Sequence, residues 1–134
     1  MKESCLETEY AEFWIHNGIV CCAIRPSVKK ITLEIATTLV KERLKSFNNQ
    51  SYPLLTDLGN MLSVEREARV YLGEGDALKF VNSVAILTSN HLAKLAANVY
   101  LRVNKPHHIP MRYFSNENEA LNWLVKHKTP EKIK

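Results

Sequence analysis

The residues best suited to binding or reaction lie between the end of an apolar stretch and the start of a charged one. Residues 56–72 read "TDLGNMLSVEREARVYL" and contain Asp57, Asn60, Ser63, Arg66 and Arg69. A serine just before a helix could accept a phosphate, and an aspartate could act as a general base. Two arginines could recognise a protein partner. Each role depends on the elements that place these side chains.

A second polar group, Thr88 with Ser89, Asn90 and His91, follows the next apolar stretch. Ser89 or Asn90 is predicted to open a helix, where a small anion or nucleotide could bind. No glycine-rich phosphate loop accompanies this site. Asp57 is the carboxylate expected to be partly buried, and the favoured role for it is to accept hydrogen bonds from backbone amides of the next loop. The sequence therefore predicts no enzyme.

Cysteines and histidines give no metal or redox motif. Cys21 and Cys22 are neighbours in a predicted strand, so their side chains should point to opposite faces, and both are interpreted as small core residues. His107 and His108 lie in the loop "KPHHIP" without the third or fourth ligand that a metal site needs. No cofactor or metal is predicted.

The elements begin with a hairpin. Asn17-Gly18 separates two strand-like runs in "FWIHNGIVCCAI", and this pair is typical of a two-residue turn with positive φ. The run from Ile19 to Ile24 is apolar on both faces, which indicates a strand inside a covered sheet. An amphipathic helix is predicted from Thr32 to Phe47, with Lys41, Glu42, Arg43 and Lys45 largely outside.

Alternating units follow. "YPLLTDL" is predicted to be a buried strand, and Ser63 is interpreted as the N-cap of a helix that carries Glu65 and Glu67 in its first turn and ends at Gly73. "VNSVAILTSN" is the next strand, and its following helix has the stripe Leu92, Leu95, Ala96, Val99 and Val103. "MRYF" precedes a final helix, where Asn116 and Glu119 have capping-box spacing. This order predicts an α/β fold: an N-terminal β-hairpin, alternating αβ units, and a mostly parallel central sheet flanked by helices.

Length and charge narrow the function classes. The chain has 134 residues and a net charge of +4, of which four lysines and one glutamate in residues 126–134 supply +3. We expect one domain over residues 1–126 and a basic tail over residues 127–134, with no nucleic-acid partner. The three cysteines, the lack of a secretory signal and the short apolar runs predict a soluble cytoplasmic protein with no transmembrane segment.

Three segments carry a resemblance to a known family: "YPLLTDLGNMLSVEREARVYL", "VNSVAILTSNHLAKLAANVYLRVNKP" and "MRYFSNENEALNWL". They resemble small bacterial single-domain proteins of the STAS fold, the SpoIIAA-like superfamily, and in particular a STAS/CRAL-TRIO-like branch of unknown function. The resemblance covers almost the whole chain. It implies a STAS-like fold and no established biochemical role.

The resemblance also tests the phosphate switch. Signalling antagonists of this fold have an Asp-Ser-Ser-Gly-like helix start whose serine accepts phosphate, and those positions fall here on Glu65, Arg66, Glu67 and Ala68. No hydroxyl stands at the acceptor position, and Ser63 is the nearest one.

The sequence therefore predicts a non-catalytic STAS-like interaction or regulatory module that lacks the phosphoacceptor serine. Its hypothesised surface comprises Asp57, Asn60, Ser63, Arg66 and Arg69, and its partner is a protein of unknown identity or a second copy in a homodimer. The alternative is a small-ligand or lipid-binding protein, which the CRAL-TRIO resemblance implies. The shortness of the chain and the packing character of the helix stripes argue against that alternative.

Overall fold

The computed structural model describes residues 3–89 and 109–127. In chain order its elements are β1 (Glu3–Glu7), β2 (Ala11–His16), β3 (Ile19–Ile24), β4 (Lys30–Ile31), α1 (Leu33–Ser46), β5 (Tyr52–Gly59), β6 (Ser63–Val64), α2 (Arg66–Leu72), the 3₁₀ helix η1 (Gly75–Leu78), β7 (Val81–Thr88), β8 (Met111–Phe114) and α4 (Glu117–Val125). The helix predicted from Ser89 or Asn90 to Val103 lies outside the described residues after Ser89, as does the tail after His127.

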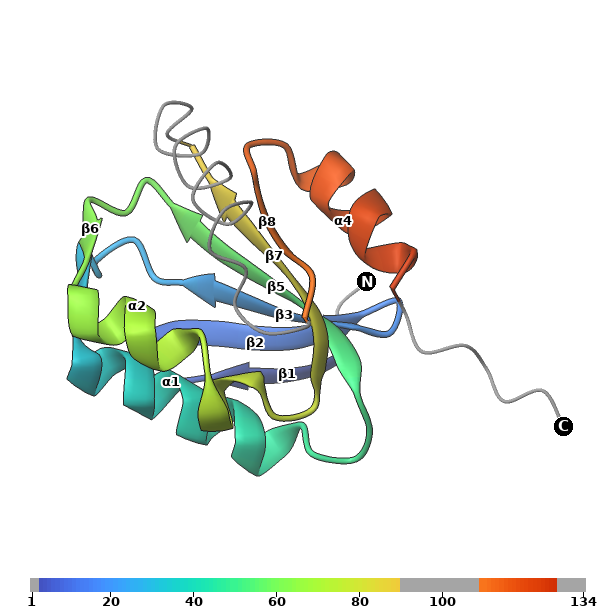
Figure 1. The fold of residues 1–134 in the computed structure, drawn as a ribbon, viewed down its shortest axis with the longest axis horizontal. Helices are drawn as coiled ribbons and strands as arrows, with labels where there is room; N and C mark the ends of the chain where they lie inside the picture. The colour runs from blue at the N-terminus through green and yellow to red at the C-terminus, as the bar shows by residue number, and fades with distance from the viewer. Residues whose placement is uncertain (1–2, 90–108, 128–134) are drawn as a thin grey trace, which may run out of the picture.

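The main sheet has the strand order β1-β2-β3-β5-β7-β8 (Figure 1). The β1–β2 and β2–β3 pairs are antiparallel, whereas the β3–β5, β5–β7 and β7–β8 pairs are parallel. The sheet is therefore mixed, with its parallel part formed by the strands that the sequence predicts to alternate with helices. Two further strands, β4 and β6, pair in a small separate sheet. Sequence reasoning missed β1, β4 and β6.

The hairpin turn has the predicted geometry. Asn17 and Gly18 both take positive φ, 57° and 80°, and His16 pairs with Ile19 across the turn. Asparagine and glycine tolerate this conformation better than other residues do, which is why the pair selects a tight turn at this point. β2 and β3 are thereby aligned over six residue pairs from Ala11↔Ile24 to His16↔Ile19.

The two faces of the sheet carry different helices. Neighbouring residues alternate between them, so that Cys22 and Leu54 belong to one apolar cluster while Cys21 and Leu55 belong to the other. Leu39 and Phe47, from α1 and its end, pack with the first cluster, and Ala120 and Leu124 of α4 pack with the second. Figure 1 shows α1 and α2 together and α4 apart from them. The prediction that Cys21 and Cys22 are core residues on opposite faces is confirmed.

Helix α1 begins as local rules predict but differs on its outer face. Thr32 is its N-cap, and the Thr32 hydroxyl accepts a hydrogen bond from the Ile35 amide at 3.2 Å. The prediction that Arg43 lies largely outside is wrong, because its side chain is buried. The guanidinium donates to the Tyr52 hydroxyl at 2.6 Å and to the carbonyls of Ala77 and Lys79 at 2.9 and 3.0 Å.

Helix α2 begins later than predicted, and Ser63 is not its N-cap. Ser63 lies in β6, where it pairs with Lys30 of β4, and the cap position belongs to Glu65, which makes no side-chain capping bond. The Glu65 carboxylate instead accepts from the Leu33 amide at 3.3 Å and lies 3.6 Å from the Lys30 ammonium. The β4–β6 pairing keeps the chain extended through Val64, which delays the helix.

Helix α4 follows its sequence signature. The Asn116 side-chain oxygen accepts from the Glu119 amide at 3.0 Å, and Ala120 and Leu124 are fully buried. This short helix is thereby held to the sheet through two residues one turn apart.

Candidate functional site

A cavity of about 740 Å³ lies on the α1 side of the sheet. Side chains of alternate strand residues form part of its lining, and these include Cys22, Leu54, Thr56, Val84, Ile86 and Met111. Residues from α1, α2, η1 and the two short strands β4 and β6 also line it, and most of the described lining is apolar. The cavity is therefore a space between the sheet and the helices that lie on this face.

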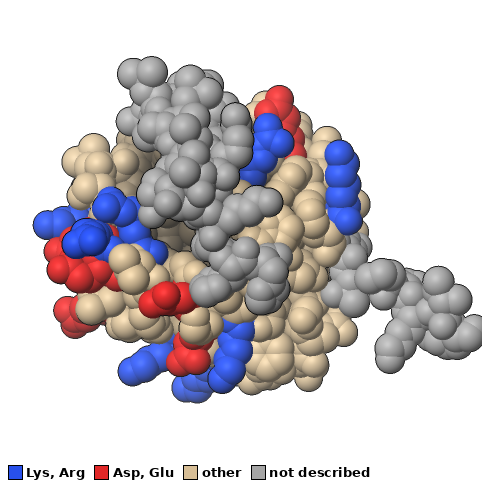
Figure 2. Space-filling model, in the orientation of Figure 1, with Lys and Arg blue, Asp and Glu red and all other residues tan. Residues whose placement is uncertain are grey.

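Helix α2 presents two different faces. Arg66, Arg69, Val70 and Gly73 line the cavity, and their spacing of three, four and seven residues places them on one side of a helix. On another side, Ala68 is fully buried in a separate apolar cluster with residues of β4 and α1. Figure 2 shows Lys and Arg side chains next to carboxylates over α2 and β6, at the left of the view.

The cavity's polar groups differ in how far they are already engaged. Arg69 donates one hydrogen bond, from Nη1 to the Val64 carbonyl at 3.2 Å, and Arg66 makes no hydrogen bond or ion pair within residues 3–89 and 109–127. Tyr113 of β8 also lines the cavity. Burial raises the pKa of Tyr113, and the positive charge of Arg69 acts in the opposite direction. Arg69 is thus close enough to Tyr113 for its charge to act on the phenol.

Cys22 and Arg43 form an interior part of the same lining. Burial raises the pKa of the Cys22 thiol to about 12, although the Arg43 charge partly offsets this. A thiol that stays protonated at neutral pH is a poor nucleophile, so this residue does not supply covalent chemistry. The hydrogen bonds of Arg43 to η1 and to Tyr52 fix its guanidinium in place.

Asp57 lies apart from the arginines with which the sequence grouped it. Its side chain is half buried and accepts a hydrogen bond from the Gly59 amide at 2.9 Å. The alternation of β5 places Asp57 on the same face as Leu55, whereas Thr56 and Leu58 line the cavity on the other face. Asp57 thus accepts a backbone amide as predicted, although the donor Gly59 is the last residue of β5 and not a residue of the next loop.

Ser89 joins the same strand end. Its amide and its hydroxyl both donate to the Gly59 carbonyl, at 2.9 and 3.0 Å, so the carboxyl ends of β5 and β7 meet as expected. Asn90 and His91, the other members of the predicted anion site, lie outside the described residues. The bonds of Ser89 hold the two strand ends together.

Asn60 and Ser63 are exposed, and their side chains make no hydrogen bond within the part of the chain that the structure describes. Arg66 and Glu67, which occupy acceptor-motif positions of the resembled antagonists, are also exposed, whereas Ala68 is buried. The five predicted surface residues therefore do not form one cluster. Arg66 and Arg69 join the cavity, and Asp57 faces away from it.

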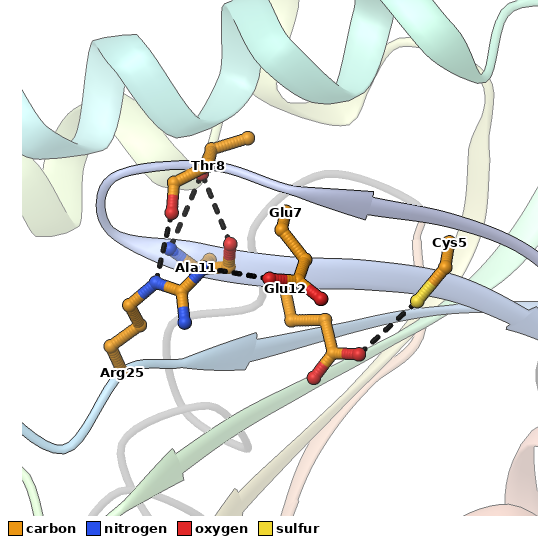
Figure 3. Close-up of polar contacts among 6 residues, drawn as sticks. All are labelled: Cys5, Glu7, Thr8, Ala11, Glu12 and Arg25. Atoms are coloured by element: carbon orange, nitrogen blue, oxygen red, sulfur yellow. Dashed lines mark hydrogen bonds and ion pairs between the residues drawn. The ribbon is translucent and has the colours of Figure 1, made fainter.

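A second polar cluster lies at the first edge of the sheet (Figure 3). The Arg25 Nε donates to the Thr8 carbonyl at 2.8 Å, and its Nη2 lies 3.8 Å from the Glu7 carboxylate. The Cys5 thiol donates to the Glu12 carboxylate at 3.1 Å. These contacts tie β1 to β2 and to the end of β3. We therefore assign these side chains a structural role, which is to hold the edge strand β1 in the sheet.

Two classes of feature are absent from residues 3–89 and 109–127. No helix there has both the length and the apolar character that a bilayer crossing requires. No three side chains among the histidines, cysteines and carboxylates of those ranges gather as metal ligands would. His107 and His108 lie outside these ranges.

Residues 13–128 match a family described as "Domain of unknown function (DUF7793)". The chain belongs to this family. No curated protein matches it. Among solved structures, the DUF7793 chain is similar to an uncharacterised protein of the DUF3478 family from Shewanella loihica PV-4, which is described as having a SpoIIAA-like fold. The two are 18% identical, with a TM-score of 0.49, and the match covers 92% of this chain and 95% of the other. A match of this strength says nothing about function.

Sequence reasoning missed the cavity of the DUF7793 chain. The sequence held one signal for the cavity, which is a helix face of mixed character, neither fully apolar nor fully charged. This face comprises Arg66, Arg69, Val70 and Gly73. A second expectation was also incomplete, since Glu65 is a half-buried carboxylate in addition to Asp57. Both features depend on where α2 meets β4 and α1.

Proposed function

We propose that this DUF7793 protein is a non-catalytic binding protein that holds a small, largely apolar ligand in the cavity beneath α1 and α2. The observation that carries the proposal is the volume of about 740 Å³ with its mostly apolar lining. Ligand pockets in proteins typically measure roughly 300–1,000 Å³ and combine apolar walls with a few polar groups. The proposal includes the cytoplasmic location and the STAS-like character that we expect from the sequence.

The size of the cavity supports a ligand over ordinary packing. Protein interiors contain few voids larger than a water molecule, because empty space forfeits dispersion contacts. On the opposite face of the same sheet, Ile19, Ala85 and Leu124 have no exposed surface. The helix stripes of α1 and α2, read from the sequence as packing residues, leave room on their own face. The shortness of the chain is therefore no argument against a ligand.

The neutral fluorophore N-phenyl-1-naphthylamine tests this proposal, because its emission rises in apolar surroundings. We expect saturable binding to the wild-type chain. Ile86→Trp would fill part of the cavity and weaken binding by about tenfold or more. Val125→Trp, on an exposed position of α4, is the matched control and should bind as wild type does.

Native mass spectrometry of protein purified from its own cells provides the second measurement. A retained small molecule, lost in the Ile86→Trp variant, would support the proposal. A bare protein mass together with no binding of the fluorophore would overturn it, because the chain's own side chains would then fill the space.

A second candidate is the interaction module that the sequence predicts, without a phosphoacceptor serine. Leu62 and Val70 are 78% and 54% exposed, and they flank the Arg66–Arg69 stretch in sequence. Exposed apolar side chains beside arginines are common at protein interfaces. Leu62 is not among the cavity-lining residues, so it separates this function from ligand binding.

A pull-down with three variants tests this second candidate. Leu62→Ser and the double variant Arg66→Glu/Arg69→Glu should both lose a protein partner, whereas Leu62→Ser should still bind the fluorophore. If both variants retain the partner, then Leu62, Arg66 and Arg69 are not part of the interface. Lys45→Glu, on an exposed position of α1, controls for the change of charge.

A further inference from the structure

We infer that the ligand is an organic anion whose apolar body occupies the cavity and whose acidic group lies beside Arg66 and Arg69. This inference rests on the proposed function and names the chemical class of its ligand. The inference is supported by charge complementarity between the arginines of the cavity lining and an acidic group.

The charged lining of the cavity is unbalanced. Among the described residues that line it, three are arginines, Arg43, Arg66 and Arg69, and one is a carboxylate, Glu74. Arg43 is buried, and its three hydrogen bonds to protein oxygens fix its guanidinium to the fold. Arg66 and Arg69 therefore supply the positive charge that is available to a ligand.

Neighbouring carboxylates do not neutralise this pair. Glu65 is engaged with the Lys30 ammonium and the Leu33 amide, at 3.6 and 3.3 Å. Glu67 is on α2 but is not among the cavity-lining residues, and Glu74 follows Gly73 beyond the other end of the helix. Arg66 and Arg69 have no ion pair within the described ranges. A ligand acid would supply the counter-ion that the described residues of α2 lack.

The guanidinium groups have donors to spare. An arginine carries five N–H donors in a planar fork that suits carboxylate, sulfonate and phosphate oxygens. Arg69 uses one donor on the Val64 carbonyl, and Arg66 uses none within the described residues. The two side chains stand three residues apart on one helix face, so both can reach the same acidic group.

The phenol of Tyr113 adds a polar group from the sheet. Tyr113 lines the cavity from β8, the last strand in the sheet order, while the arginines line it from α2. Its hydroxyl stays protonated at neutral pH, since burial raises its pKa. The cavity lining thus combines two cations and a neutral hydroxyl with apolar side chains such as Leu54, Val84 and Met111.

Two fluorophores that differ by one acidic group test the inference. N-phenyl-1-naphthylamine is neutral, and 8-anilino-1-naphthalenesulfonate carries the same aromatic body with a sulfonate. We expect the sulfonate to bind the wild-type chain about tenfold or more tightly than the neutral compound, because charge-assisted hydrogen bonds add to the apolar contact. The double variant Arg66→Gln/Arg69→Gln should abolish this preference and leave the binding of the neutral compound unchanged.

Arg112→Gln is the matched control. Arg112 neighbours Tyr113 on β8, is exposed, and is not among the cavity-lining residues. Its substitution is the same Arg→Gln change and removes one of the two charges that the double variant removes. It should preserve the preference for the sulfonate. Inorganic phosphate at the same ionic strength as a chloride control should not displace the sulfonate compound, since phosphate has no apolar body to occupy the cavity.

The outcomes separate the two proposals. If neither fluorophore binds, the proposed function fails. If both bind equally well, or if Arg66→Gln/Arg69→Gln and Arg112→Gln reduce the preference alike, the anionic ligand is overturned while the apolar cavity stands. Displacement by inorganic phosphate would also overturn it, because the site would then recognise the ion alone.

Discussion

The two faces of the sheet use the same strands but are completed in different ways. On the α4 face, Ile19, Ala85 and Leu124 are fully buried in one apolar cluster. On the α1 face, Leu54 and Ile24 border a cavity of about 740 Å³, and a buried arginine connects the helix to η1. Strand alternation supplies apolar side chains to both faces equally. What covers each face decides whether those side chains meet partners or line a space.

The largest expected effect comes from the polar anchor of the cavity face. Arg43→Ala should lower the free energy of unfolding by about 3–5 kcal/mol, because Tyr52, Ala77 and Lys79 each lose a buried donor. Urea denaturation measures this change. Lys45→Ala, on the exposed side of α1, should stay within about 0.5 kcal/mol of wild type. A loss below about 1 kcal/mol for Arg43→Ala would mean that the anchor does not hold this face.

Leu54 and Leu55 compare the faces directly, since they are neighbours on β5 with side chains on opposite sides. Leu55→Ala should cost about 3 kcal/mol or more, as a close-packed site cannot collapse around the lost atoms. Leu54→Ala should cost at least about 1 kcal/mol less, because Leu54 already borders the cavity. Equal losses in chemical denaturation would contradict the contrast between a packed face and an open one.

Alkaline pH probes the buried thiol of the cavity face. Burial raises the pKa of Cys22 from 9.0 to about 12, so the folded chain holds this proton more tightly than the unfolded chain. The resulting stability is complete below pH 9 and is lost as the pH rises toward 12. Between pH 9 and 11, wild type should lose about 2 kcal/mol more than Cys22→Ala does. Parallel pH curves for the two proteins would show that Cys22 is not buried.

The smallest expected change in the free energy of unfolding concerns the residues at the starts of α1 and α2. Thr32→Ala should lower the free energy of unfolding by about 1 kcal/mol, because the Ile35 amide loses its cap. Ser63→Ala should change it by less than about 0.5 kcal/mol, because Ser63 lies in β6 and caps nothing. A loss of about 1 kcal/mol for Ser63→Ala in thermal or urea denaturation would restore the sequence interpretation of this residue.

Most elements within the described ranges could be predicted because their signals are local. Asn17 and Gly18 specify their own turn, and Asn116 caps a helix through an amide three residues away. The continuous apolar runs of β3, β5 and β7 identify buried strands. β1 escaped prediction because it is placed by its pairing with β2, and the contact of Arg25 with Thr8, just after β1, spans 17 residues. β4 and β6 escaped because a two-residue strand carries no periodic pattern.

The candidate site was predicted less completely than the fold. Asp57 accepts a backbone amide as expected, yet it lies on the opposite face from the arginines that the sequence grouped with it. The sequence pattern shows which residues are polar. It does not show whether a residue of a strand and a residue of a helix lie on the same face of the sheet. Arg66 and Arg69 belong together because α2 turns one face to the cavity.

The sequence by itself determined the Asn17-Gly18 turn, the cap of α4 and the alternation of side chains, since each depends on interactions within a few residues. Tertiary structure alone decided the burial of Arg43, whose partners lie 9, 34 and 36 residues away along the chain. It also decided the extended backbone at Ser63 and the cavity itself. No sequence pattern encodes a cavity directly, because its volume depends on the distance between the helices and the sheet.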